Sequence, residues 1–146
     1  MEELMPVIEE HLRIGQSVRI YPRGVSMRPL IREGKDSVTI SAVQGTLSKN
    51  DIVLFRFGEH YVLHRFVGVG KNGYVFCGDH RYTYERGVAE ESIVAVVTAI
   101  SRNGKDVRMG SFGYRVYVWL IFTRRRLRQL VLRIVRRMCR SLHKRK

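Results

Sequence analysis

The sequence lacks any apolar stretch of the roughly 18 consecutive residues that a helix needs to cross a bilayer. Its longest apolar run, residues 116–122, is followed closely by three arginines. Residues 1–15 contain four glutamates and no continuous apolar run, which is not the pattern of a secretory signal. These absences predict a cytoplasmic protein with no signal peptide and no transmembrane span.

Cysteine is scarce as well. The two cysteines, Cys77 and Cys139, are far apart in the chain and do not have a spacing typical of metal ligands. This disfavours a disulfide framework and is compatible with a reducing intracellular location. We expect neither a metal site nor a cofactor.

Acidic residues are absent from residues 112–146, although this segment holds 12 of the 27 lysines and arginines. All 13 acidic residues precede it, so the net charge of +14 is concentrated in the tail. Apolar residues recur in the tail at three- and four-residue spacing, with arginines between them. They are Leu127, Leu130, Val131, Ile134, Val135, Met138 and Leu142. This pattern predicts a long, basic amphipathic helix over residues 111–146.

The predicted tail helix suits an anionic membrane surface, because one side is apolar and the other is rich in arginine. Tyr114, Tyr117 and Trp119 stand at its start, where amphipathic rings suit a membrane interface. We therefore expect peripheral binding at the inner face of the membrane. Two alternatives stay open: packing of the apolar side on protein, and contact of the arginines with RNA phosphates, which is the least favoured.

The residues before the tail fall into two zones. Leu4, Met5, Ile8 and Leu12 have helical spacing and Gly15 provides a stop, which predicts a short helix within residues 1–15. Over residues 16–110, short β-branched and aromatic runs alternate with turn residues. The expected strands are 18–21, 37–42, 52–57, 61–69, 74–77, 93–100 and 106–109. This zone is therefore predicted to be a small, mainly antiparallel β domain.

Two Asn-Gly pairs interrupt the predicted strands, at Asn72-Gly73 and Asn103-Gly104. Such pairs favour tight hairpin turns, because both residues tolerate a positive φ. We expect a hairpin at each pair.

Ser26 is a candidate nucleophile. It follows a predicted strand, with Gly24 two residues before it and Pro29 three residues after it. Such a constrained turn can expose the hydroxyl, and Gly24 lets a substrate backbone come close. The pattern alone decides little, since most loop serines only complete the hydrogen bonds of a turn.

Residues 24–29 (Gly-Val-Ser-Met-Arg-Pro) resemble the nucleophile motif of the S24/S26 serine peptidases, which include signal peptidases and self-cleaving SOS-type repressors. Three more segments resemble motifs of this family in the same order. Residues 47–55 resemble its Gly-Asp-Ile-Val segment, with Asn50 in place of glycine, a mild change where φ is positive. Residues 62–67 resemble the strand that carries the general base, and residues 77–87 resemble a Gly-Asp box. The resemblance implies a β fold of the signal-peptidase and repressor C-terminal type.

The base position is occupied by His64, where typical bacterial signal peptidases have lysine. The histidine resembles the archaeal and endoplasmic-reticulum type of signal peptidase. A neutral imidazole can accept the proton of the serine hydroxyl. The resemblance implies an acidic third residue to orient the imidazole; Asp79 is the first candidate and Glu85 the second. Without the resemblance, His64 and Asp79 would be an ordinary strand histidine and an ordinary turn aspartate.

The resemblance also concerns the substrate side of the site. Gly24 stands where some members have a serine that assists the oxyanion, so backbone N–H groups, including that of Ser26, are expected to do so here. We expect Gly24, Met27 and Pro29 to contact the substrate or to shape the oxyanion site.

The implied function is that of a serine endopeptidase that cleaves an extended peptide after a small residue. The substrate would add as a strand to the edge of the sheet. Because no export signal or anchor was recognised, a cytoplasmic leader or precursor peptide is the expected substrate. The alternative is a catalytically inactive peptide-binding or accessory module of the same fold. A self-cleaving repressor is disfavoured, because the first zone is too short for a helix-turn-helix and no Ala-Gly bond is present.

Overall fold

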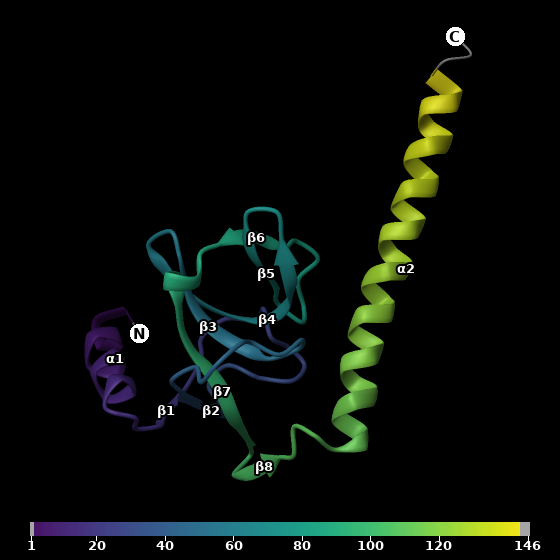
Figure 1. Ribbon diagram of the computed structural model, residues 1–146. Coiled ribbons are helices and arrows are strands. Elements are labelled where there is room, and N and C mark those ends of the chain that lie inside the picture. Colours follow the sequence, from purple (N-terminus) through teal and green to yellow (C-terminus); the bar gives the residue numbers. More distant parts are fainter. Residues whose placement is uncertain (1, 144–146) are drawn as a thin grey trace. The chain divides into compact units, whose positions relative to one another are not determined.

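A computed structural model describes the backbone of residues 2–143 and the side chains of residues 3–135 (Figure 1). The chain divides into two compact units, Met1–Met109 and Gly110–Lys146. We refer to them as the β unit and the tail unit and describe each by itself.

The β unit is built on one antiparallel sheet, as the sequence predicts. Seven strands follow the order β1-β2-β7-β3-β4-β5-β6, and β8 pairs with β7. Their bounds are β1 Val18–Ile20, β2 Asp36–Ser41, β3 Ile52–Phe57, β4 His60–Gly70, β5 Gly73–Cys77, β6 Glu85–Val88, β7 Ile93–Arg102 and β8 Lys105–Val107. All seven expected strands are present, and β6 was not expected. In β6 only Val88 is buried, and charged residues and a glycine precede it, so the strand lacks a recognisable alternation.

Both predicted hairpins form, but their turns differ. Between β7 and β8, Asn103 and Gly104 take φ values of 51° and 75° at the two central positions, as a tight turn with two positive φ angles requires. Between β4 and β5, Gly70 pairs with Gly73, so the turn residues are Lys71 and Asn72. The second Asn-Gly pair is therefore displaced by one position from the centre of its turn.

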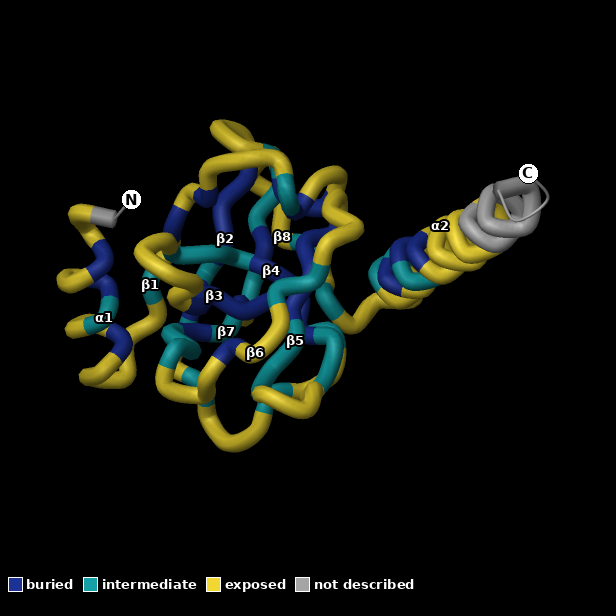
Figure 2. Tube along the Cα trace, turned by 90° about the horizontal axis from the view of Figure 1, so that it is seen from above, coloured by how far each residue is buried: buried dark blue, intermediate teal, exposed yellow. Residues whose placement is uncertain are grey.

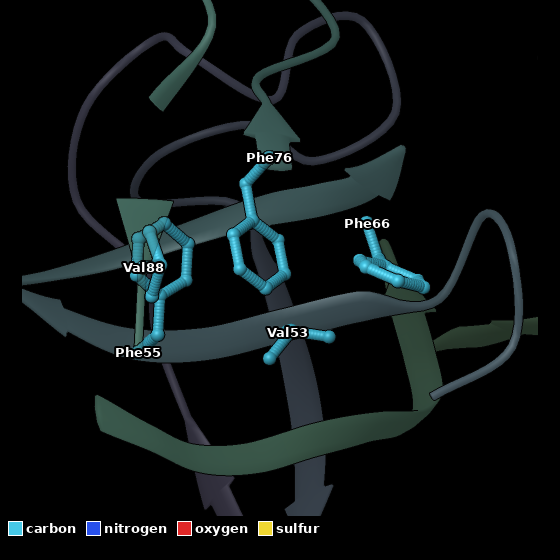
Figure 3. Packing of buried hydrophobic residues seen from close by; sticks show 5 residues of the cluster. All are labelled: Val53, Phe55, Phe66, Phe76 and Val88. Atoms are coloured by element: carbon cyan, nitrogen blue, oxygen red, sulfur yellow. The ribbon is translucent and has the colours of Figure 1, made fainter. Parts of the chain in front are cut away.

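The core of the β unit is aromatic. Val53, Phe55, Phe66, Phe76 and Val88 form one buried cluster, contributed by four strands (Figure 3). The rings of Phe55 and Phe76 are stacked, with their centroids 4.2 Å apart. This cluster fixes β3, β4, β5 and β6 relative to one another, and these strands carry most of the candidate site.

The N-terminal helix α1 (Met5–Arg13) follows a short 3-10 turn, η1 (Glu2–Leu4), and lies beside β1 (Figure 2). It buries Met5, Ile8 and Leu12, which are three of the four apolar residues that predicted it. Gly15 takes φ 80° and donates its N–H to the carbonyl of Leu12. The helix therefore ends on a glycine in the left-handed region, as predicted.

The described part of the tail unit forms one helix, α2 (Phe112–His143). Its apolar side chains include Leu127, Leu130, Val131, Ile134 and Val135, each about half exposed. None of the helices in the described part of the chain combines the length and apolarity that crossing a bilayer requires. The side chains of Met138, Cys139 and Leu142 lie outside the described residues.

The long loop after β1 is fastened to β2 by an ion pair. Asp36 is fully buried and accepts hydrogen bonds from the backbone N–H, Nε and Nη2 of Arg32 at 2.8, 2.9 and 2.8 Å. Nη2 of Arg32 also donates to the side chain of Asn103 in the β7–β8 turn, at 2.9 Å. The hydrogen bonds from Arg32 hold the pKa of Asp36 below its ordinary value, although burial acts in the opposite direction.

We expect the Asp36–Arg32 pair to stabilise the β unit only while Asp36 is ionised. Because the pKa of Asp36 is lower in the folded chain, its contribution is complete above the unfolded-state pKa of about 4. It disappears as the pH falls through the folded-state value. Asp36→Asn should therefore lower the free energy of unfolding at pH 7 and flatten its dependence on pH below about 4, as measured by urea denaturation.

Asp106→Asn, at an exposed position of β8, is the matched control and should keep the pH dependence of the parent. If Asp36→Asn and the parent lose stability in parallel between pH 4 and pH 3, the pair does not have this role.

Candidate active site

The loop that carries Ser26 is held in place by buried apolar side chains of its own. Met27, Leu30 and Ile31, which follow the serine, are 4%, 6% and 2% exposed. Gly24 has a φ of 95°, which a side chain at this position would strain. Buried anchors therefore follow the serine and a glycine precedes it, and Ser26 itself is partly exposed.

His64 lies on β4 and is 5% exposed. Its Nδ1 atom is 2.9 Å from Oε2 of Glu85, the first residue of β6. A carboxylate can only accept a hydrogen bond, so Nδ1 is the donor and a neutral imidazole has its acceptor at Nε2. The ring also meets Phe55 edge to face, with the centroids 6.4 Å apart. The imidazole is therefore oriented by a carboxylate and an aromatic ring.

Asp79, the first candidate for orienting His64, has a different contact. Both of its carboxylate oxygens accept hydrogen bonds from the guanidinium of Arg65, from Nε at 2.8 Å and from Nη2 at 2.7 Å. Both side chains are fully buried. The acid at Nδ1 of His64 is thus Glu85, and Asp79 completes a buried bidentate ion pair. Arg65, a residue to which the sequence assigned no role, is the structural partner of the Gly-Asp box.

The Gly-Asp box also holds the Ser26 loop. The backbone N–H of His80 donates to the carbonyl oxygen of Ser26 at 2.8 Å. A Cβ atom on Gly78 would lie only 2.7 Å from that same oxygen and 2.8 Å from Nε2 of His64. Real Cβ atoms do not come so close, so glycine at position 78 is required by this packing. The nucleophile loop, the box and the acceptor nitrogen of His64 therefore meet at one point.

Arg65 also reaches the second resembling segment, residues 47–55. Its Nη1 donates to the backbone carbonyl of Asn50 at 2.8 Å. Asn50 has φ 81°, in the left-handed region where the family has glycine, as the sequence predicted. The four segments that carry the resemblance are thus joined through Arg65, Asp79 and the Ser26 carbonyl.

A cavity of about 380 Å³ lies over these residues. Ser26, His64 and Glu85 line it together with Gly24 and Met27. Pro29 is exposed on the same loop and is not part of the lining. The structure therefore brings together five of the seven predicted site residues around one cavity, whereas Asp79 and Pro29 are not part of its lining.

Ser26 and His64 share the cavity but are not joined by a hydrogen bond. Within residues 2–143, neither the hydroxyl nor the backbone N–H of Ser26 is engaged in one. Hydrogen bonds of catalytic groups are often long in an unliganded site and tighten when substrate binds. Both groups of Ser26 are available to an incoming ligand.

One wall of the cavity is an unpaired sheet edge. Residues 60–65 of β4 pair with β3 on one side, whereas β5 pairs with β4 only from Arg65 onward. On the other side, residues 62–64 have no strand partner in the described chain, and all three line the cavity. An extended peptide could add to this edge beside Ser26.

Comparison with protein families, curated proteins and solved structures finds no match for this chain.

The two acids should differ in their effect on stability. Asp79→Asn leaves the buried charge of Arg65 without its counterion, and we expect a loss of about 3–5 kcal/mol in the free energy of unfolding. Glu85→Gln keeps a hydrogen-bond acceptor at Nδ1 of His64, in a position that is 16% exposed. We expect a loss of about 1 kcal/mol or less. Urea denaturation of both variants measures the difference; equal losses would contradict the assignment of Asp79 to Arg65 and Glu85 to His64.

Proposed function

We propose that this chain is a serine endopeptidase of the signal-peptidase type, with Ser26 as nucleophile and His64 as general base. The observation that carries the proposal is the joint position of Ser26, His64 and Glu85 around one cavity, with Glu85 at Nδ1 of His64. A nucleophile, a base and an acid that orients the base form the arrangement used in acyl transfer. The motif resemblance is independent support for the same assignment.

In this mechanism Nε2 of His64 accepts the proton of the Ser26 hydroxyl while Oγ attacks the carbonyl carbon of the scissile bond. The carbonyl oxygen becomes an oxyanion, to which the backbone N–H of Ser26 can donate. His64 then returns the proton to the leaving amine, and an acyl-enzyme remains on Ser26. Attack by water, with His64 again as base, releases the acid and restores the serine. Glu85 stabilises the imidazolium formed in each half, and no cofactor takes part.

The proposed substrate is an extended peptide cut after a small residue, and a cytoplasmic leader or precursor is the class we favour. The unpaired side of residues 62–64 can supply backbone hydrogen bonds to such a peptide. Gly24 has no side chain that would obstruct the approach of the substrate backbone to Ser26.

A second candidate is a peptide-binding module of the same architecture without catalytic activity. The observation in its favour is that the Ser26 hydroxyl makes no hydrogen bond to His64. The unpaired edge and the cavity would serve both functions equally. Only a chemical test of the serine separates them.

The peptidase proposal predicts that a fluorophosphonate labels Ser26 and that labelling needs His64. Ser26→Ala should abolish labelling and cleavage of a peptide library, and His64→Ala should lower both by about a thousandfold or more, because the serine loses its base. Mass spectrometry of the labelled chain and of the peptide products measures the two effects.

Ser17→Ala and His60→Ala, at exposed positions of the same unit, are the matched controls and should behave as the parent. Activity that survives Ser26→Ala would exclude the peptidase, and peptide binding without any labelling would favour the inactive module.

We further propose that α2 binds an anionic membrane surface. The exposed residues Leu127, Leu130, Val131, Ile134 and Val135 recur on one side of the helix, and residues 112–146 contain no acid. Apolar burial and attraction of the arginines to anionic headgroups would act together.

Leu130→Glu should weaken flotation with liposomes that contain phosphatidylglycerol by about tenfold or more, because one buried leucine is worth about 1.5–3 kcal/mol. Leu132→Glu makes the same change outside the stripe and should have a smaller effect, since residue 132 lies about 200° around the helix from residue 130. Flotation that is insensitive to salt and to Leu130→Glu would contradict the proposal.

A further inference from the structure

A second groove lies in the β unit, away from His64. It has a volume of about 430 Å³ and runs between η1–α1 and β1. Leu4, Val7 and Ile8 line one wall, and residues 18–21 line the other. Leu4, Val7 and Tyr21 are 62%, 57% and 65% exposed. Large apolar side chains so exposed on both walls of one groove are typical of a binding surface rather than of scattered surface residues.

The groove follows the free edge of the sheet. β1 is the last strand of the sheet order and pairs only with β2. Side chains alternate between the two faces of a strand, yet four consecutive residues, 18–21, all line the groove. The groove therefore runs along the strand edge, where β1 has no strand partner in the described chain. An edge of four residues, about 13 Å long, matches a short extended segment.

The charge of the lining is of one sign. Arg19 and Arg23 line the groove, and no acidic residue does. Within the described chain neither guanidinium forms an ion pair or a side-chain hydrogen bond. His11, the remaining titratable group of the α1 wall, is hydrogen-bonded through Nδ1 to the side chain of Gln16. An apolar groove bordered by two uncompensated arginines is complementary to a ligand with apolar and acidic side chains.

We propose that this groove is a second peptide-binding site, which takes an extended segment of alternating apolar and acidic residues. The strand edge supplies backbone hydrogen bonds, the η1–α1 wall receives the apolar side chains, and Arg19 and Arg23 pair with the acids.

The groove and the site cavity have one lining residue in common. Arg23 lines both, and β1 leads directly into the loop that carries Ser26. A single extended peptide can therefore occupy the groove with one part and reach Ser26 with another. In that case the segment in the groove would be a recognition sequence remote from the scissile bond. This extension of the proposal rests on the proposed peptidase function.

The test measures binding and not cleavage. The full chain with Ser26→Ala is titrated with a fluorescein-labelled, acetylated peptide of four Val-Glu repeats, and fluorescence anisotropy gives the Kd. A Val-Gln peptide of the same length is the matched ligand. We expect the Val-Glu peptide to bind about tenfold more tightly, with an affinity that falls as salt is raised.

Val7→Glu and Arg19→Gln should each weaken binding of the Val-Glu peptide by about tenfold or more. Both residues are exposed, so neither change disturbs the core. The matched controls are Val69→Glu at the exposed end of β4 and Arg56→Gln on β3, which lie outside the groove and should leave binding unchanged.

Equal binding of the two peptides, or binding unaffected by Val7→Glu, would overturn the proposal. Two other results would also overturn it, because each identifies a different occupant of the groove. In the first, Val7→Glu converts a dimer to a monomer in sedimentation. In the second, the peptide does not bind and Val7→Glu abolishes flotation on anionic vesicles. This test and the test of the peptidase can fail independently. Binding of the peptide without any cleavage would support the second binding site and not the peptidase. Cleavage with no effect of Val7→Glu or Arg19→Gln on Kd or KM would support the peptidase and contradict the second binding site.

Discussion

The arrangement of the candidate site depends on the buried ion pair between Arg65 and Asp79. Two fully desolvated charges are tolerated only when they stay together, so the pair fixes the Gly-Asp box against β4. His64 precedes Arg65 on that strand, and His80 follows Asp79 and donates to the carbonyl of Ser26. One interaction thus sets the position of His64, the proposed base, and, through one further hydrogen bond, the position of the loop that carries Ser26. Its role is positional, and the proposed chemistry belongs to other side chains.

Much of the fold was predictable because local pattern and tertiary environment agree. Strands with buried β-branched and aromatic residues, the Asn-Gly turn at Asn103 and the helix stop at Gly15 all follow from short-range rules. β6 did not follow, because at the edge of a sheet a strand needs few buried residues and Glu85–Val88 has one. That omission affects the site directly, since β6 supplies the acid of His64.

Which acid contacts His64, Asp79 or Glu85, depends on strand register, and register cannot be read from the spacing of residues along the chain. On β4 side chains alternate, so His64 lies on the face of Phe66 and the aromatic cluster, whereas Arg65 lies on the opposite face. Glu85 pairs with Phe76, a member of the same cluster, and so shares the face of His64. The sequence did contain a signal for the role of Asp79. An arginine inside an apolar strand, here Arg65, needs a buried acid as its partner, and Asp79 was a candidate.

Some groups of the candidate site are held by hydrogen bonds or ring contacts and others are not. This difference suits the proposed cleavage reaction, in which substrate binding would complete the site. The imidazole of His64 is held by Glu85 and Phe55, and the backbone of Ser26 is held by His80, but the hydroxyl of Ser26 is held by nothing within the described chain. In the proposed reaction, this hydroxyl would form its hydrogen bond to Nε2 only when a peptide lies along the edge beside it. Ordering it only then places binding energy in the transition state rather than in the empty site. Two strand edges have no strand partner in the described chain, at residues 62–64 and along β1, and an extended peptide could add to either.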